Sequence, residues 1–343
     1  MNTLSRIAVG IVIAALSYSS AGAAEITLTL HHFLSSKAPT HTKFLTPWAK
    51  KIEADSNGRI EIKIFPSMSM GGKPPELYRQ VRDGVADIVW TLPGYTPGVF
   101  PRSEAFELPT VHRGNAEATN LAIQENFSLI AKDFKDVHPI LIHVHAGNAL
   151  HTVSKSILSV ADVKGLKFRT PSRTGAWMIQ AWGAEPVGMP IPALPQALSK
   201  GNIDGALVPF EMVAPLKLQQ LTKYSVEGAD KSRFGTAIFM FAMNKDRYNS
   251  LPADLQKVID NNSGANWAGL IGKVWDANEE LGKQLQAKSK GGEVISLDAK
   301  AKTDFDSIGQ LVVDKWIVEA NKFSIDGAAL VKAARASIDK YSK

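Results

Sequence analysis

The sequence predicts an α/β protein of two domains. Three observations predict it: strand-like and helix-like segments take turns along the chain, its 343 residues exceed what one hydrophobic core usually organises, and no composition typical of a flexible linker interrupts them. Strands and helices in alternation are typical of parallel sheets with crossover helices. The chain contains no cysteine, so its stability has to come from large apolar cores and not from disulfides.

The first 23 residues have the pattern of a secretory signal peptide. Arg6 precedes an apolar run at 7–16, and small residues lead to Ala23. We expect cleavage after Ala23 or Ala24 and export of the mature chain to the periplasm. No later apolar run approaches the roughly 18 residues that a membrane-spanning helix needs, so we expect the mature protein to be soluble.

Strand and helix patterns alternate through the first half of the mature chain. Apolar residues alternate with period two at 25–33, 59–65, 88–92 and 138–148, and helical periodicity occupies 39–54 and 75–85. The strand at 88–92 leads into a loop rich in Pro and Gly. Loops of this kind at strand ends surround the ligand crevice in open α/β sheets.

The alternation repeats in the second half, which ends in helices. Strand patterns lie at 165–171, 184–189, 204–209, 235–244 and 291–297, and helical patterns at 172–182, 192–200 and through most of the chain from 252. Because no linker separates the blocks, we expect two domains that exchange strands near Gly147 and Phe234. The predicted division is domain I at 24–146 and 235–274, domain II at 147–234 and 275–330, and a C-terminal helix or tail at 331–343.

Charge and motifs argue against several classes of function. The net charge of +6 is spread without a basic cluster, so we expect no nucleic-acid partner. The eight histidines lack the spacing of metal ligands, and we expect neither a metal nor a cofactor. Nucleophile elbows and complete phosphate-binding loops are also missing from the sequence. A binding protein is therefore favoured over an enzyme.

Aromatic side chains near predicted strand ends suggest a ligand crevice. Each aromatic residue taken singly is more typical of a core, but together they would line an apolar pocket suited to a ring. The aromatic candidates are Phe33, Trp90, Tyr95, Phe100, Phe210 and Phe239, and Pro171 and Met189 complete the apolar set.

Arg169 ends the strand pattern of residues 165–171. One interpretation is an ordinary solvated arginine, the commonest state of this residue type. The other is a planar fork that holds a carboxylate through two parallel hydrogen bonds. The residues alone leave both interpretations open.

The mature chain resembles the DctP-like substrate-binding proteins of tripartite ATP-independent periplasmic (TRAP) transporters. The segments that carry the resemblance, in order, include WAKKIEADSNGRIEIKIFPSMSMGG at 48–72, DVKGLKFRTPS at 162–172 and ALSKGNIDGALVP at 197–209. The resemblance implies a periplasmic-binding-protein fold, in which two α/β domains are joined by crossing strands and a long domain-spanning helix and close over a ligand. It also implies that Arg169 is the arginine that binds a carboxylate.

Two departures from the family pattern narrow the expected ligand. A second arginine is common in the segment that matches 147–155, and an asparagine in the segment that matches 206–209, but this chain has neither there. In a pocket without these polar groups, the hydroxyl groups of a sugar acid would be buried without partners, at a cost of about 1–3 kcal/mol each. We therefore expect an acid with an apolar body: an aromatic monocarboxylate is the first choice and a small 2-hydroxy or 2-keto acid the second. His31, His32, His145 and Asn148 are candidates to bind its carboxylate or hydroxyl groups.

The resemblance also implies partners for the protein. We expect a monomer that delivers an organic acid to the membrane subunits of a TRAP permease. An exported enzyme that acts on a small carboxylic acid, or a binding partner of a membrane sensor, are the alternatives.

Overall fold

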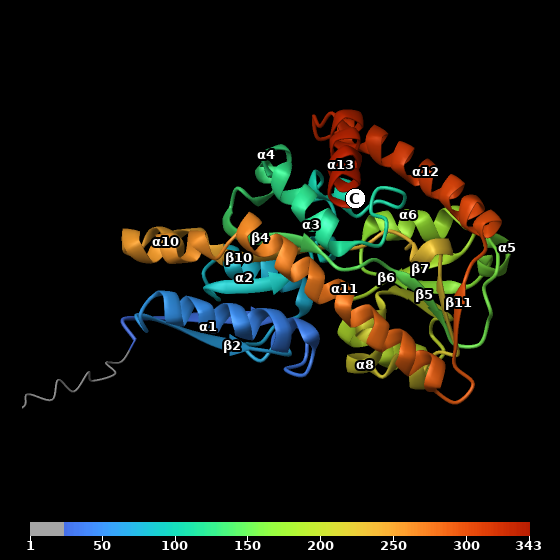
Figure 1. Cartoon of the computed structure of the whole chain (residues 1–343), viewed down its shortest axis with the longest axis horizontal. Helices are drawn as coiled ribbons and strands as arrows, with labels where there is room; N and C mark the ends of the chain where they lie inside the picture. Colours follow the sequence, from blue (N-terminus) through green and yellow to red (C-terminus); the bar gives the residue numbers. More distant parts are fainter. Residues whose placement is uncertain (1–23) are drawn as a thin grey trace, which may run out of the picture.

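A computed structural model describes residues 24–343, which form two α/β domains with one mixed sheet in each (Figure 1). The predicted signal peptide at 1–23 lies outside the described residues. The strands are β1 Ile26–His32, β2 Ile60–Phe65, β3 Ile88–Thr91, β4 Val137–Val144, β5 Ala149–Thr152, β6 Lys167–Thr170, β7 Glu185–Gly188, β8 Gly205–Val208, β9 Tyr224–Glu227, β10 Ile238–Asn244 and β11 Glu293–Ser296. The helices are α1 Thr46–Asp55, α2 Leu77–Arg82, α3 Ala116–Glu125, α4 Phe127–Ile130, α5 Val160–Val163, α6 Arg173–Ala181, α7 Leu194–Ser199, α8 Val213–Leu216, α9 Lys245–Asn249, α10 Ala253–Asn261, α11 Ala265–Lys288, α12 Ala299–Asn321 and α13 Gly327–Tyr341.

The first sheet has the order β2-β1-β3-β10-β4, and the second has the order β11-β9-β5-β8-β6-β7. In the first, β1 is parallel to β2 and β3, whereas β10 is antiparallel to β3 and β4. In the second, β6 is parallel to β7 and β8, whereas β5 is antiparallel to β8 and β9. The parallel pairing that the alternation indicated is present in both sheets, whereas β5 and β10, which adjoin the two crossings, run antiparallel to their neighbours.

The chain passes between the sheets at two adjacent segments. After β4 it turns at Gly147 and enters the second sheet as β5, and it returns before β10. The two crossings are hydrogen-bonded to each other, because Asn148 N–H donates to the carbonyl of Gly235 at 2.8 Å and Phe234 N–H to the carbonyl of Asn148 at 2.9 Å. The strand exchange near Gly147 and Phe234 is therefore as predicted, while the residue boundaries of the domains stay a prediction.

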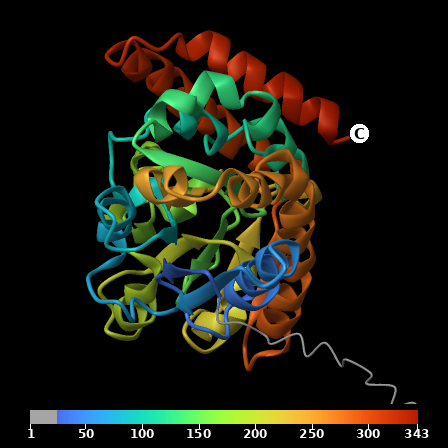
Figure 2. The same cartoon turned by 90° about the vertical axis from the view of Figure 1, so that its left-hand side faces the viewer.

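The long helix α11 packs against both domains (Figures 1 and 2). Two glycines allow the close approach: a Cβ atom at Gly272 would lie 2.3 Å from Cα of Glu117 in α3, and one at Gly282 would lie 1.9 Å from the carbonyl oxygen of Phe210. The carboxylate of Asp276, between these glycines, accepts the N–H groups of Ala116 and Glu117 at the start of α3. Helix α12 then packs on α6, and α13 returns to α3.

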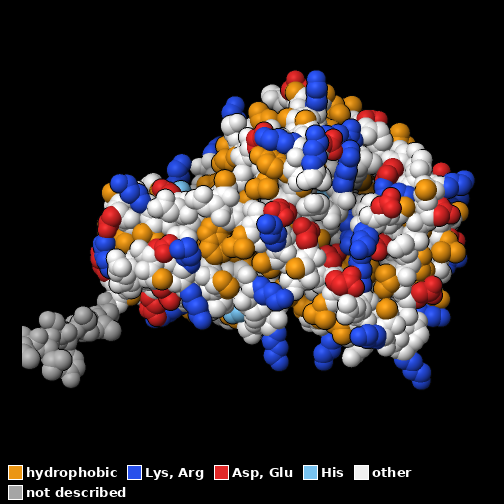
Figure 3. All heavy atoms as spheres, in the orientation of Figure 1, with side chains coloured by type: hydrophobic (Ala, Val, Ile, Leu, Met, Phe, Trp, Pro, Cys, Tyr) orange, Lys and Arg blue, Asp and Glu red, His pale blue; other side chains and the backbone are white. Residues whose placement is uncertain are grey.

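The face of the molecule drawn in Figure 3 is mixed in charge. On the face drawn in Figure 3, acidic and basic side chains are interspersed over both domains. No helix within residues 24–343 combines the length and the apolar character needed to cross a membrane.

Candidate functional site

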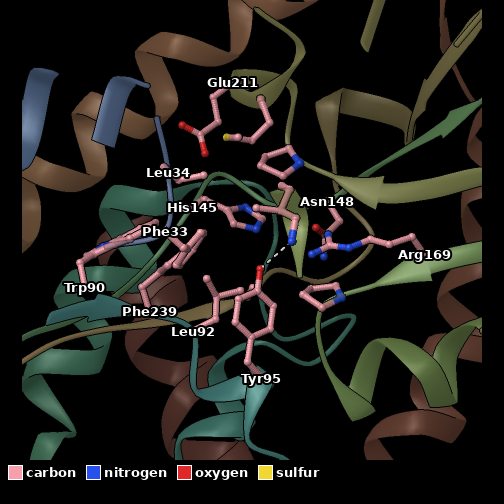
Figure 4. A pocket seen from close by; sticks show the side chains of 15 residues that line it. Phe33, Leu34, Trp90, Leu92, Tyr95, His145, Asn148, Arg169, Glu211 and Phe239 are labelled. Atoms are coloured by element: carbon pink, nitrogen blue, oxygen red, sulfur yellow. Dashed lines mark hydrogen bonds between the residues drawn. The ribbon is translucent and has the colours of Figure 1, made fainter. Parts of the chain in front are cut away.

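A cavity lies between the two sheets (Figure 4). The first sheet and its loops contribute Phe33, Leu34, Trp90, Leu92, Tyr95, His145, Ala237 and Phe239. The crossing and the second sheet contribute Asn148, Arg169, Pro171, Ile191, Pro209, Glu211 and Met212. We call these two sets the aromatic wall and the polar wall.

The aromatic wall consists of rings that pack on one another. Trp90, in β3, stacks between Phe33 at 5.0 Å and Phe239 at 4.6 Å, measured between ring centroids. Tyr95 meets Phe33 edge-on at 5.6 Å. The indole N–H of Trp90 donates to Nε2 of His143 at 3.0 Å, away from the cavity, so the wall offers the faces and edges of rings and can bind another ring by stacking.

Strand β6 places Arg169 on the polar wall. Successive residues of a strand face opposite sides, so Phe168 enters the apolar core of the second domain with Trp182 while Arg169 faces the cavity. Arg169 is only 2% exposed. Its Nε donates to the carbonyl of Met189 at 3.0 Å and its Nη1 to the carbonyl of Leu207 at 3.2 Å, and these two bonds fix the plane of the fork.

The third nitrogen of the Arg169 guanidinium, Nη2, has no hydrogen-bond partner. Burial lowers the pKa of Arg169, but an arginine keeps its proton in a protein. No carboxylate within residues 24–343 forms an ion pair with it. A buried cation without an anion is costly, and a carboxylate in the cavity would relieve that cost.

His145 and Asn148 flank the first crossing and face the cavity. The N–H of Gly147 donates to Nδ1 of His145 at 2.9 Å, so the neutral ring carries its proton on Nε2. Burial holds the pKa of His145 well below its usual range, which keeps the ring neutral. The amide nitrogen of Asn148 donates to the carbonyl of Thr236 at 3.3 Å, whereas its Oδ1 has no partner.

Tyr95 links the two walls through its hydroxyl group. The hydroxyl oxygen accepts the backbone N–H of Ile191 at 2.9 Å, the hydrogen bond drawn in Figure 4. Burial raises the pKa of Tyr95, with an opposing effect from Arg169, so the phenol stays protonated. The contact holds a loop of the first domain against a segment of the second.

Glu211 is the carboxyl group of the polar wall. It is 6% exposed and its Oε2 has no hydrogen-bond partner. Burial, and then the nearby carboxylate of Glu279, raise the pKa of Glu211 well above its ordinary value. In Figure 4 its carboxyl lies on the Leu34 side of the cavity, whereas the Arg169 guanidinium lies beside Asn148.

The structure brings most of the predicted site residues together. Those that line the cavity are Phe33, Trp90, Tyr95, His145, Asn148, Arg169, Pro171 and Phe239. Those that do not are His31, His32, Met189 and Phe210, together with the aromatic candidate Phe100.

The two predicted histidines of β1 are engaged elsewhere. His31 pairs through Nδ1 with Oε1 of Gln80 at 2.8 Å and accepts the N–H of Met70 on its other nitrogen at 3.3 Å. His32 pairs through Nε2 with Nδ1 of His41 at 2.9 Å. Their ring nitrogens are therefore satisfied within the first domain.

The apolar candidates outside the cavity have packing roles. Phe210 lies edge-on to His151 at 5.3 Å, under the guanidinium of Arg233. Phe100 packs against Tyr78 at 4.8 Å and against Phe134. Met189 lies in an adjoining groove and contributes its carbonyl to Arg169.

Glu211 is the polar cavity residue that the sequence did not suggest. It follows the strand pattern at 204–209 directly, but nothing in the local pattern distinguishes it from a solvated surface glutamate. Helix α11 packs against the segment that holds it, and Oε1 of Glu279 accepts the backbone N–H of Glu211 at 2.9 Å. No cluster of three potential metal ligands occurs within the described part of the chain.

Comparison with known proteins identifies the family. The model of the bacterial extracellular solute-binding proteins of family 7 matches residues 30–319. A solved TRAP solute-binding protein from a marine metagenome, specific for aromatic acid ligands and bound to 3-hydroxybenzoate, is 44% identical with a TM-score of 0.90, over 93% of this chain and 100% of that one.

Two further relatives support this assignment. A TRAP solute-binding protein from Rhodoferax ferrireducens T118, solved with copurified benzoate, is 41% identical with a TM-score of 0.89, over 92% of this chain and 98% of that one. The ectoine/5-hydroxyectoine-binding periplasmic protein UehA of Ruegeria pomeroyi is 24% identical over 84% of each chain. The chain therefore belongs to family 7 of the bacterial extracellular solute-binding proteins, the substrate-binding proteins of TRAP transporters.

Proposed function

We propose that this protein captures an aromatic monocarboxylate in the cavity between its domains and delivers it to the membrane subunits of a TRAP transporter. The observation that carries the proposal is the buried guanidinium of Arg169, which has a free Nη2 and no carboxylate partner within residues 24–343, in a cavity whose other wall is made of stacked rings. A ligand with one carboxylate on a ring satisfies both walls.

The carboxylate would bind to Arg169 on the polar wall. The donors available in the cavity include the Nε2–H of His145, the free Nη2 of Arg169 and the O–H of Tyr95, whose oxygen accepts from Ile191. Charge-assisted hydrogen bonds in a dry cavity are about twice as strong as neutral ones, so these donors would orient the acid. The ring would lie against Trp90, Phe33 and Phe239.

The solved relatives add independent support for this ligand class. Two relatives above 40% identity were solved with 3-hydroxybenzoate and with benzoate, each an aromatic ring with one carboxylate. A small 2-hydroxy or 2-keto acid, the second choice from the sequence, would leave the stacked rings without an apolar partner.

The test is a panel of acids added to the mature protein. We expect benzoate and its hydroxylated derivatives to raise the melting temperature by several degrees, and lactate and pyruvate to leave it unchanged. Ligand recovered from the complex should be chemically unchanged, which separates capture from an enzymatic reaction. Stabilisation by lactate or pyruvate but not by benzoate would contradict the proposal.

Export and a monomeric state belong to the same proposal. The signal-peptide pattern at 1–23 supports cleavage near Ala23 or Ala24. N-terminal sequencing of the exported protein would test the cleavage site, and its elution volume on size exclusion would test the monomer.

A further inference from the structure

The buried polar atoms of the cavity can be matched one by one with groups on a ligand. Seven buried side-chain nitrogens and oxygens within residues 24–343 lack a hydrogen-bond partner, and three of the seven belong to residues that line this cavity. They are Nη2 of Arg169, Oδ1 of Asn148 and Oε2 of Glu211. Because buried polar atoms are normally satisfied, this concentration indicates the hydrogen-bonding groups that a ligand must supply.

One of the three atoms is a donor and two are oxygens. A ligand carboxylate satisfies the donor, Nη2 of Arg169, but it has no hydrogen to give to Asn148 or to Glu211. The apolar body of an unsubstituted aromatic acid cannot give one either. Benzoate would therefore leave both oxygens without partners in the closed cavity.

Glu211 has no partner in the protein for Oε2. None of the ion pairs within residues 24–343 involves Glu211. The neighbouring carboxylate of Glu279 is different, because Nη2 of Arg233 lies 3.1 Å from it. The Glu211 backbone is held by Glu279, so the carboxyl group is fixed in place without being satisfied.

We propose that Glu211 binds a hydroxyl group on the ring of the ligand, so that the preferred ligand is a hydroxylated aromatic monocarboxylate. This inference rests on the proposed function and names the part of the ligand that the polar wall selects. A hydroxyl group fits whether Glu211 is charged or neutral, because a hydroxyl both donates and accepts. Burial, and then the carboxylate of Glu279, raise the pKa of Glu211 well above its ordinary value, which favours the neutral form that can also donate.

The experiment is calorimetric titration of the mature protein with benzoate and with 2-, 3- and 4-hydroxybenzoate. We expect at least one hydroxybenzoate to bind about 10- to 100-fold more tightly than benzoate, the range for one buried hydrogen bond to a polar or charged group. In Glu211→Leu that ratio should fall to within about threefold. Glu211→Gln keeps a hydrogen-bonding group of the same shape and should keep most of the preference.

Glu280→Leu is the matched control, because it removes an exposed carboxyl from α11 one residue after Glu279 and should leave the ratio unchanged. Equal binding of benzoate and all three hydroxybenzoates by the wild type, or an unchanged preference in Glu211→Leu, would overturn the inference while the proposed function stands. Failure of every aromatic acid to bind would instead contradict the proposed function.

If Glu211→Leu does not fold, a crystal structure of the wild type with the tightest hydroxybenzoate decides. A ring hydroxyl hydrogen-bonded to Glu211 supports the inference, and one hydrogen-bonded elsewhere overturns it.

Discussion

The two walls of the cavity differ in how far their polar groups are satisfied within the protein. On the aromatic wall, the N–H of Trp90 and the hydroxyl oxygen of Tyr95 have hydrogen-bond partners, and the Nε2–H of His145, beside the crossing, is left for the ligand. On the polar wall, Arg169, Asn148 and Glu211 each keep one buried atom without a partner. From this difference we expect the aromatic wall to bind the ring of the ligand and the polar wall to select the substituents that the ring carries.

The largest expected effect follows from removing the cation of the polar wall. Arg169→Met should weaken the binding of every aromatic acid about 100-fold or more, because a bound carboxylate would then be buried without its partner. Arg169→Lys should have an intermediate effect, since the charge stays but the planar fork is lost. Calorimetric titration with benzoate measures both.

Arg59→Met is the control for Arg169. Arg59 is exposed and pairs with Glu25 and Asp254 far from the cavity, so the substitution should not alter Kd. If Arg169→Met binds benzoate within threefold of the wild type while remaining folded, the polar wall does not bind the carboxylate.

A second prediction concerns Glu107, which connects the two domains. One oxygen accepts the N–H of Ile238 in β10 at 3.2 Å, and the other accepts the hydroxyl of Thr174 in α6. Burial, with a contribution from Glu104, raises the pKa of Glu107 to about 7. The folded protein therefore binds this proton more tightly than the unfolded chain does.

The sign of the pH dependence follows from that difference. The stabilisation by the Glu107 proton is complete below the pKa of the unfolded chain and is lost as the pH rises through about 7. Relative to Glu107→Gln, the free energy of unfolding of the wild type should fall by about 2 kcal/mol between pH 5 and pH 8. Urea titrations of both proteins at the two pH values measure this fall. The contributions of the other titrating groups to the free energy of unfolding cancel in the difference between the two proteins. A difference that does not change with pH would show that Glu107 is ionised throughout.

The fold was largely predictable because most strands and helices have clear periodicity. The patterns at 25–33, 59–65 and 235–244 correspond to β1, β2 and β10. Strands β5 and β9 were missed, since each has only four residues and their buried positions show no alternation that separates them from loops. Their antiparallel pairing depends on the route of the chain between sheets, which no local pattern records.

The site residues could be predicted only where the position of a residue along a strand determines the direction of its side chain. Arg169 faces the cavity because it alternates with Phe168, a feature that can be read from the sequence. His32 is adjacent to Phe33, which lines the cavity, but it pairs with His41 from the following helical turn. Glu211 required knowledge of α11, which lies some 70 residues further along the chain and packs against its segment.

The smallest expected effect tests the aromatic wall. Phe33 stacks on Trp90 and meets Tyr95 edge-on, and its side chain has no polar atom. Phe33→Leu should weaken benzoate and 3-hydroxybenzoate alike, by about 2- to 12-fold, because a ligand ring loses one aromatic neighbour. The ratio of the two dissociation constants should stay as in the wild type, in contrast to Glu211→Leu.

Phe100→Leu is the matched control for Phe33→Leu. Phe100 has the same side chain, but it packs on Tyr78 and Phe134 outside the cavity. It should lower the melting temperature without changing either dissociation constant. If Phe33→Leu instead changes the ratio of the two constants, the aromatic wall also distinguishes substituents, and the division between the walls is wrong. If Phe33→Leu weakens both ligands equally and leaves the ratio of their dissociation constants unchanged, ring binding and the selection of substituents depend on different residues.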